Sequence, residues 1–532
     1  MIDYLVRNGV VFDGSGSEPV ETSIGIYGDR ITYIGDGEVP ARAVIDAKGL
    51  VVSPGFIDAH AHSEFTILAD GRAEGKLSQG VTTEINGNCG LSAAPLYGEA
   101  FEHREADLKE LGIKERWSTF SEYFNILKSK GIAINFGTLC GHGNIRASVI
   151  GYKDAAPDEN ALNEMKRLLS DAVRDGAKGL STGLIYPPGV YSKTGELIEL
   201  AKILSIPQNP PLTKGGQGGV GIYATHMRSE GDALTEAIEE VIMIGKGAGV
   251  NVHISHIKTA GKRNWWKVDS AIELIESARK EGVRLTCDRY PYIAASTDLD
   301  TILPSWVYDG GAEEELRRLK DADTAKKIKS EIGFRDDNYW KGIYISSVTK
   351  SENKWMEGES IFDIAMKIGK SPIDALFDIL IDEKVRAGAI FFSMNEDNLK
   401  RFLTLPYAMI GSDSSVRSFS GQTCTGRPHP RAFGSFTRFV GKYVRDGGIL
   451  SLSEAIKKMT YLPALTFGLK GRGLIKEGFF ADIVIFDYER IIDTATFKEA
   501  YKKSEGIEYV FVNGKLAVKE GEFTGGLSGR II

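Results

Sequence analysis

Short apolar runs alternate with longer stretches of helical periodicity through most of this chain. Residues 158–176 (DENALNEMKRLLSDAVRDG) predict a helix, because apolar residues recur every three or four positions and Gly176 follows as a stop signal. The next run, AKGLSTGLI, is short and bounded, as a buried parallel strand would be. The pattern therefore predicts strands and helices in regular alternation.

Eight candidate strands can be placed along the chain. Strands that alternate with helices are typical of an α/β protein built as a (β/α)8 TIM-like barrel, in which catalytic residues gather at the carboxyl ends of the strands. The chemistry is therefore expected at those ends. They lie near His60, Cys89, Gly137, Ser181, His226, His256, Asp288 and Asp413.

The two ends of the chain follow a different pattern, with alternating residues and turn pairs. Neither end has enough strands for a stable sheet, so we expect residues 1–54 and 470–532 to pair into one small β-sandwich domain beside a catalytic barrel at 55–469. Residues 289–412 are too long for a simple crossover and predict an inserted helical subdomain or lid before the last barrel strand. The Pro- and Gly-rich segment 205–221 predicts a surface loop.

Composition limits the possible functions. The chain of 532 residues is 42% hydrophobic and 26% charged, as in globular proteins, and no apolar run approaches the roughly 20 residues of a membrane span. No signal peptide is visible, and four cysteines suit a reducing compartment, so we expect a cytoplasmic protein. A net charge of −7 gives no support for nucleic-acid binding.

Two histidines, His60 and His62, stand one residue apart in GFIDAHAHSEF. Strand alternation alone can place two histidines on one face, and an isolated pair would favour that interpretation. However, His226, His256 and Asp413 also follow predicted strands. Imidazoles and a carboxylate at barrel-strand ends are a ligand set suited to Zn²⁺.

These residues carry a family resemblance. The pattern of an HxH pair after the first strand, single histidines after the fifth and sixth, and an aspartate after the eighth resembles the amidohydrolase superfamily. The motifs GVTTEINGNCG, GAKGLSTGLIYPPGVYSKTGEL, YATHMRSEG, ISHIK, DRYPYIAAST, GSDSS and HPRAFGSFTRFVGKYVRDGG are similar to the D-aminoacylase group, the N-acyl-D-amino-acid deacylases. The resemblance extends over nearly the whole chain, although the 205–221 segment departs from it.

The resemblance implies a metal site. His60, His62 and Asp413 would bind a first metal position, His226 and His256 a second weaker one, and Cys89 would be shared between them or anchor a single tight zinc. A carboxylated lysine bridges the metals in many superfamily members, so Lys178 at the start of the fourth strand is the alternative to Cys89. The alternative for Cys89 itself is an inert buried thiol.

Two other histidines are assigned by strand position. His253 pairs with residue 255 in the two-residue period of a strand, and not with His256, so we expect it to face the helices and to be structural. His142, after the third strand, is either a partner of a metal ligand or a turn residue.

The implied activity is zinc-dependent hydrolysis of the amide bond of N-acyl-D-amino acids, a small-molecule reaction. Asp413 would act as general base and then as general acid, and Arg431 would bind the substrate carboxylate, with Tyr191, Tyr292 and Ser296 as further substrate contacts. The alternatives are a dihydroorotase-like or hydantoinase-like enzyme of the same superfamily, or a metal-free binding or scaffold protein.

Overall fold

The barrel is present in the structure, a computed structural model that describes residues 1–37, 39–205 and 221–532. Within these ranges, eight parallel strands form it, and each ends within four residues of its predicted end. They are β6 (Phe56–Asp58), β7 (Val81–Asn86), β8 (Asn135–Thr138) with its continuation β9 (Cys140–Gly141), β10 (Gly179–Gly183), β11 (Ile222–His226), β12 (Asn251–Ile254), β13 (Leu285–Arg289) and β17 (Ala408–Ile410). The ring closes where the Ala59 amide donates to the Ile410 carbonyl at 3.2 Å.

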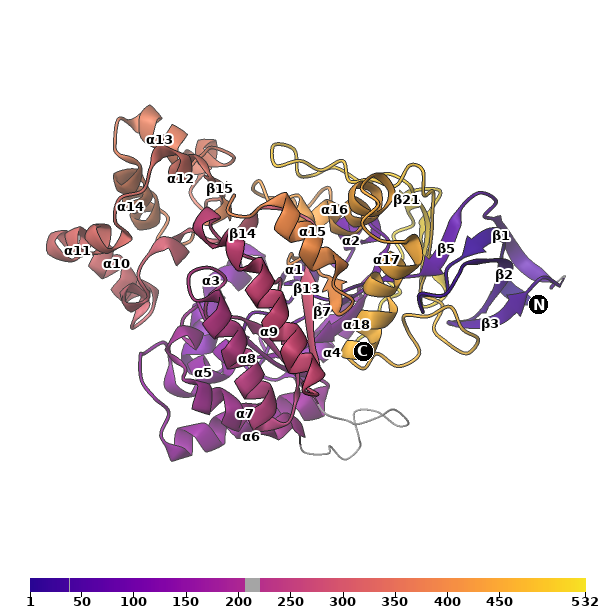
Figure 1. Cartoon of the computed structure of the whole chain (residues 1–532), viewed down its shortest axis with the longest axis horizontal. Coiled ribbons are helices and arrows are strands. Elements are labelled where there is room, and N and C mark those ends of the chain that lie inside the picture. Colours follow the sequence, from indigo (N-terminus) through magenta and orange to yellow (C-terminus); the bar gives the residue numbers. More distant parts are fainter. Residues whose placement is uncertain (38, 206–220) are drawn as a thin grey trace.

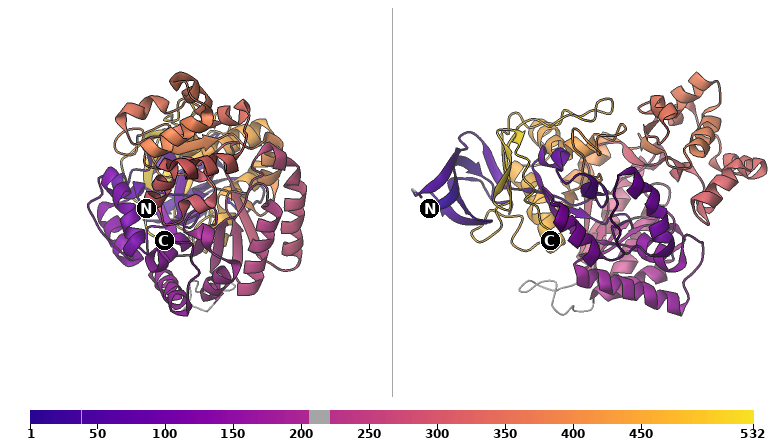
Figure 2. Two further views of the ribbon diagram at one scale, coloured as in Figure 1. Left: turned by 90° about the vertical axis from the view of Figure 1, so that its left-hand side faces the viewer. Right: turned by 180° about the vertical axis from the view of Figure 1, so that it is seen from behind.

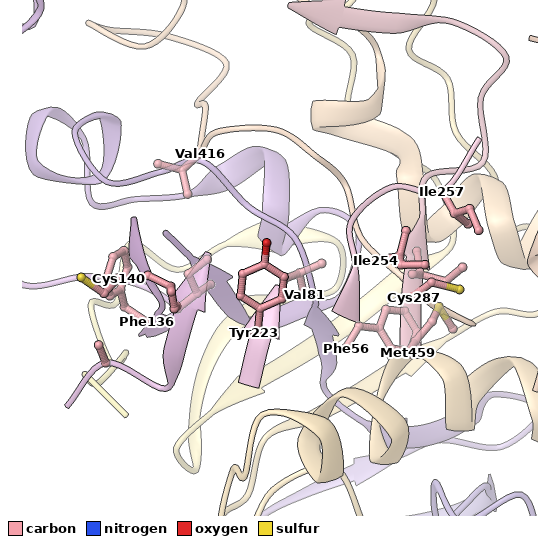
Figure 3. Close-up of a cluster of buried hydrophobic side chains, with 14 of the residues drawn as sticks. Phe56, Val81, Phe136, Cys140, Tyr223, Ile254, Ile257, Cys287, Val416 and Met459 are labelled. Carbon is pink, nitrogen blue, oxygen red and sulfur yellow. The ribbon is translucent and has the colours of Figure 1, made fainter. Parts of the chain in front are cut away.

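Helices surround the strands and bury the outer face of the barrel. The helix predicted at 158–176 is confirmed as α6 (Glu159–Asp175): Asp158 caps it by accepting a hydrogen bond from the Ala161 amide, and Gly176 ends it at a φ of +127°. The other main helices of this layer are α3 (Gly98–Glu110), α4 (Phe120–Lys130), α5 (His142–Ile150), α7 (Thr194–Ser205), α8 (Leu234–Ala248), α9 (Val268–Lys280), α15 (Glu396–Thr404), α17 (Leu452–Met459) and α18 (Tyr461–Thr466). Figure 3 shows strand and helix residues such as Phe56, Ile254 and Met459 in this core.

A second set of side chains fills the inside of the barrel. Ile57, Ile85, Ala224 and Met409, one residue from each of four strands, belong to one buried cluster that also includes Phe467. Alternate strand residues point to opposite faces, so these positions mark the inward face of each strand. A residue that stands opposite one of these positions in the sheet register therefore also points into the barrel.

Strands from both ends of the chain form one sheet beside the barrel (Figure 1). The antiparallel pairing of β5 (Val51–Pro54) with β18 (Ile483–Phe486) joins the two ends. The other strands of this sheet are β1 (Ile2–Val11), β2 (Val20–Tyr27), β3 (Arg30–Gly35), β4 (Ala41–Asp46), β19 (Ile507–Val512), β20 (Lys515–Lys519) and β21 (Glu522–Phe523). The domain boundaries at residues 54 and 469 stay predictions.

The inserted region lies at the opposite end of the molecule from β1–β3 (Figure 2). Its helices are α10 (Ala312–Lys320), α11 (Ala322–Ile332), α12 (Asp337–Lys341), α13 (Ile361–Ile368) and α14 (Pro372–Asp382). A purely helical subdomain was too simple a prediction, because β14 (Ala295–Asp298), β16 (Gly388–Phe391) and β15 (Ile343–Ser347) add an antiparallel sheet. Leu299, Ile345 and Leu380 belong to a hydrophobic core that is separate from the barrel core.

The loop predicted at 205–221 lies, apart from its two end residues, outside the described part of the chain. Among the helices that the structure describes, none combines the length and apolar character needed to cross a membrane.

Candidate metal centre

The side chains of His60, Cys89 and His256 meet at the carboxyl end of the barrel. Cys89 Sγ lies 3.4 Å from His60 Nε2 and 3.3 Å from His256 Nε2. These residues follow β6, β7 and β12, so the parallel strands bring together positions far apart in the sequence. One ligand atom from each residue lies within 4.8 Å of the others, a spacing that could hold a metal ion.

Two further groups of ligand atoms adjoin this one. His62 Nε2 lies 3.2 Å from His60 Nε2 and 3.2 Å from Asp413 Oδ1. On the other side, His226 and Glu230 form a group with His256. Because the groups share His60 and His256, the six residues predicted as ligands from the sequence lie in one continuous cluster, joined by Glu230.

Three of these residues have an unusual backbone. The φ angles of Cys89, His256 and Asp413 are +52°, +35° and +52°. Left-handed φ values are uncommon outside glycine, and strained residues concentrate at functional sites where the surrounding structure holds them. Each of the three stands two or three residues beyond the end of its strand, so the chain turns there and directs the side chain to the cluster.

The ionisable groups of the cluster are linked in charge. Burial raises the pKa of the Cys89 thiol, but His60 and His256 beside it outweigh this effect, and the pKa lies well below its usual range. Burial also raises the pKa of Asp413, and Arg431 and His256 outweigh this effect, so its pKa lies well below normal. These shifts favour the Cys89 thiolate and the Asp413 carboxylate, which are the protonation states of metal ligands.

Burial lowers the pKa values of His60 and His256, but Asp288 beside His60 and Glu230 beside His256 outweigh it, and the pKa of His256 rises to about 10. The imidazoles would therefore release protons when a metal binds.

His226 supplies an independent test of whether the residues fit a metal. It is 5% exposed, and within the described part of the chain neither ring nitrogen has a hydrogen-bond partner. The Oε2 atom of Glu230 lies 3.6 Å from His226 Nε2, beyond hydrogen-bond distance. Buried polar atoms are almost always satisfied, so an imidazole placed this way fits a metal ligand.

Asp413 also faces a guanidinium group. Arg431, the first residue of α16 (Arg431–Arg438), is 5% exposed, and its Nη1 lies 2.8 Å from Asp413 Oδ2. The approach is not aligned as a hydrogen bond, which leaves this donor without a partner among the described residues. One oxygen of Asp413 thus faces the histidines and the other faces a cation that has donor capacity to spare.

Comparisons with known proteins show the family of this chain. The model of the amidohydrolase family matches residues 43–210 and 355–518. D-aminoacylase of Alcaligenes xylosoxydans xylosoxydans is 36% identical over 532 residues, covering 100% of this chain and 97% of that protein. The chain belongs to the amidohydrolase family.

Solved structures place this amidohydrolase more narrowly. A D-aminoacylase described by its binuclear metal centre covers 100% of this chain and 99% of its own, with a TM-score of 0.82 and 34% identity. An N-acyl-D-glutamate deacylase of Bordetella bronchiseptica, complexed with zinc and a phosphonate inhibitor, gives the same coverage and a TM-score of 0.82 at 32% identity. A D-hydantoinase reaches a TM-score of only 0.54 at 15% identity, which shows a shared fold.

The structure separates the predicted substrate contacts of this amidohydrolase. The Ser296 carbonyl accepts a hydrogen bond from Arg431 Nη2 at 3.2 Å, so Ser296 positions the arginine through its backbone. The Tyr292 hydroxyl donates to Asp493 Oδ2 at 3.2 Å and is engaged away from the metal ligands. Tyr191 lines a cavity of about 460 Å³ next to Arg228. Their roles as substrate contacts stay predictions.

The two remaining candidates lie apart from the cluster. Lys178 precedes β10, at the amino end of the barrel strands, whereas the metal ligands follow the carboxyl ends. The structure therefore brings Cys89, and not Lys178, between the histidines. His142 begins α5 and lies 2.9 Å from Glu196 Oε1, in an ion network that also includes Arg146.

His253 was wrongly predicted to face the helices. In the sheet register it stands opposite Ala224, which belongs to the interior layer, so its side chain points into the barrel. Its Nε2 lies 2.8 Å from Asp288 Oδ2, and the same oxygen lies 3.0 Å from His60 Nδ1. The prediction assumed regular alternation to residue 256, but β12 ends at Ile254 and the chain then turns.

Several residues that contact the cluster were missed from the sequence. Lys258 Nζ lies 2.8 Å from His256 Nδ1 and forms an ion pair with Glu230. The guanidinium carbon of Arg431 lies 4.8 Å from the centroid of the Tyr290 ring. The buried Tyr290 hydroxyl has no hydrogen-bond partner among the described residues. Both stand two residues from a strand-end candidate, in ISHIK and DRYPY, which was the available signal.

We expect Asp288→Asn to weaken metal binding about 10- to 100-fold, as measured by competition with a chelator. Asp288 holds His60 through Nδ1 and accepts the His256 amide at 3.0 Å, so its charge orients one histidine of each ligand group. Burial raises the pKa of Asp288, but His60 and His253 hold it well below normal, so the residue is a carboxylate.

Thr286→Val is the matched control for this variant. Among the described residues, the Thr286 hydroxyl has one side-chain hydrogen-bond partner, Nδ1 of His253 at 2.9 Å, so its loss should leave metal affinity close to that of the wild type. Unchanged affinity in Asp288→Asn would contradict the orienting role.

Proposed function

We propose that this protein is a zinc-dependent N-acyl-D-amino-acid deacylase, which hydrolyses the amide bond to a carboxylate and a free D-amino acid. Relatives with this type of activity match it over essentially the whole chain at 32–36% identity. The four cysteines, all among the described residues, are free thiols, which supports a cytoplasmic site of action.

One observation carries the proposal. Asp413 lies between the histidines and Arg431, with Oδ1 at 3.2 Å from His62 Nε2 and Oδ2 at 2.8 Å from Arg431 Nη1. A substrate whose carboxylate is held by the arginine would therefore present the neighbouring amide to the metal ligands. N-acyl amino acids have this arrangement, since the amide nitrogen and the carboxylate share one carbon.

His60, His62, Cys89 and Asp413 would hold the tightly bound zinc, and His226 and His256, with Cys89, would hold a second and weaker one. Bound there, zinc would lower the pKa of a water from about 15.7 to about 7 and polarise the amide carbonyl. Thiolate, imidazole and carboxylate together are the donor types that zinc prefers.

The residues of the chain supply the proton transfer and the binding. Asp413 takes a proton as general base and returns it to the departing amine as general acid, because an amide nitrogen leaves poorly without protonation. Arg431 pairs with the α-carboxylate, and a guanidinium can do so through two parallel hydrogen bonds. Tyr290 lies beside Arg431 and Lys258 lies beside His256, so they add a hydroxyl and a cation next to these residues.

We expect the zinc-loaded protein to release free amine from N-acetyl-D-amino acids and to leave the L enantiomers, dihydroorotate and hydantoins essentially unchanged. The measurement is amine release across a panel of matched D and L substrates. Preferential hydrolysis of dihydroorotate or a hydantoin would favour the cyclic-amide alternative. Absence of zinc in the purified protein, with no activity after zinc is added, would favour a binding or scaffold protein.

A further inference from the structure

Lys76 is a fully buried lysine that the proposed reaction does not use. It belongs to the short helix α2 (Glu74–Leu77), and its side chain is 0% exposed. Its Nζ lies 2.5 Å from Asp58 Oδ2 and 3.6 Å from Glu84 Oε2. A buried cation is costly unless its partners satisfy it, so this position depends on a specific network.

The network of Lys76 reaches the backbone on both sides of Asp413. Lys76 Nζ donates to Ser412 Oγ at 2.8 Å and to the Ser414 carbonyl at 3.2 Å. These two residues flank Asp413, whose left-handed φ of +52° requires support from neighbouring groups. Removal of the ammonium would leave both flanking contacts unmade.

The same network reaches the loop of the paired histidines. Asp58, the partner of Lys76, accepts the His60 amide at 3.2 Å and the Ser412 amide at 2.8 Å through Oδ1. On the other side, Glu84 accepts the hydroxyl of Ser63, the residue after His62, at 3.0 Å. One ammonium group therefore connects the two loops that carry three of the proposed ligands.

We propose that Lys76 is a positioning residue for the metal centre, which fixes the loop of His60 and His62 against the loop of Asp413. The proposal rests on the proposed zinc site. Among the hydrogen bonds and ion pairs of the described residues, Lys76 contacts no side chain of a proposed metal ligand, and it acts through Asp58, Ser412 and Ser414. Its removal should change how the ligands bind metal, beyond any loss of stability.

The chain offers a matched control in a second buried lysine. Lys458, in α17, is 2% exposed and donates to the carbonyls of Leu405 and Ala408. These contacts lie at the amino end of β17, whereas those of Lys76 lie beyond its carboxyl end. Lys76→Met and Lys458→Met thus remove the same group from opposite ends of one strand.

The test compares zinc affinity, by chelator competition, and the visible absorption spectrum of the cobalt-substituted protein, with the melting temperature recorded for each variant. We expect Lys76→Met to bind zinc about 10- to 100-fold more weakly and to alter the cobalt bands. Lys458→Met should keep the wild-type zinc affinity and spectrum even if it melts earlier. A folded Lys76→Met with wild-type affinity and spectrum would overturn the proposal, as would an equal loss in Lys458→Met.

If Lys76→Met does not fold, the double variant Lys76→Met/Asp58→Asn removes both charges of the closest pair and keeps the oxygen that accepts the backbone amides. Weaker zinc binding in that variant supports the proposal, and wild-type binding overturns it. Wild-type protein that binds no zinc would instead contradict the proposed function itself, so the two failures are distinguishable.

Discussion

Asp413→Asn is expected to keep zinc, while its kcat falls by about 10²- to 10⁴-fold or more. This is the usual contribution of general acid–base catalysis. The asparagine oxygen can still face the histidines, but an amide has no usable basic site near neutral pH. Asparagine also tolerates the left-handed backbone of this position, so the loop should keep its conformation. The loss should appear mainly in kcat, because Arg431 would still hold the substrate carboxylate.

The zinc content of Asp413→Asn decides between two roles. A variant that retains zinc and hydrolyses N-acyl-D-amino acids at near wild-type kcat would show that another group is the base. Loss of zinc together with activity would identify Asp413 chiefly as a ligand.

Cys89→Ala is expected to lose bound zinc and activity together while the barrel stays folded. The thiolate lies between His60 and His256, at 3.4 and 3.3 Å from their Nε2 atoms, so its removal leaves an incomplete ligand set on both sides. Metal analysis and circular dichroism of the purified variant measure the two parts of this expectation.

Cys140→Ala is the matched control for Cys89→Ala. Cys140 is fully buried outside the metal cluster, and burial raises the pKa of its thiol, so it is an inert core residue. Its variant should keep zinc even if it is less stable. Normal zinc content in Cys89→Ala would show that Cys89 is not the anchor, and the cluster would then rely on its histidines and carboxylates.

The barrel and the proposed ligands could be predicted because both depend on local order. Each proposed ligand lies at the end of a strand or a few residues beyond it. The carboxyl ends of the parallel strands all lie at the same end of the barrel, so residues at these positions are close together in space. The six residues from His60 to Asp413 lie together for this reason.

The surrounding residues depend on where the chain turns after a strand, which periodicity does not reveal. The alternation that should have turned His253 outward stops at Ile254. Beyond β13, the loop directs Tyr290 to Arg431 and Tyr292 to Asp493, a choice that the motif DRYPY alone left open. Lys76 and Asp288 matter only through partners that are distant in the sequence.

The inserted region gives this fold a separate means of evolutionary change. Its hydrophobic core does not merge with that of the barrel, yet β14 supplies the Ser296 carbonyl to Arg431 and the Thr297 hydroxyl to Tyr186. Substitutions behind β14 can therefore reshape one wall of the site without repacking the strands that hold the metal ligands. Proteins with these metal ligands could therefore evolve different substrate side-chain preferences while the ligands stay in place.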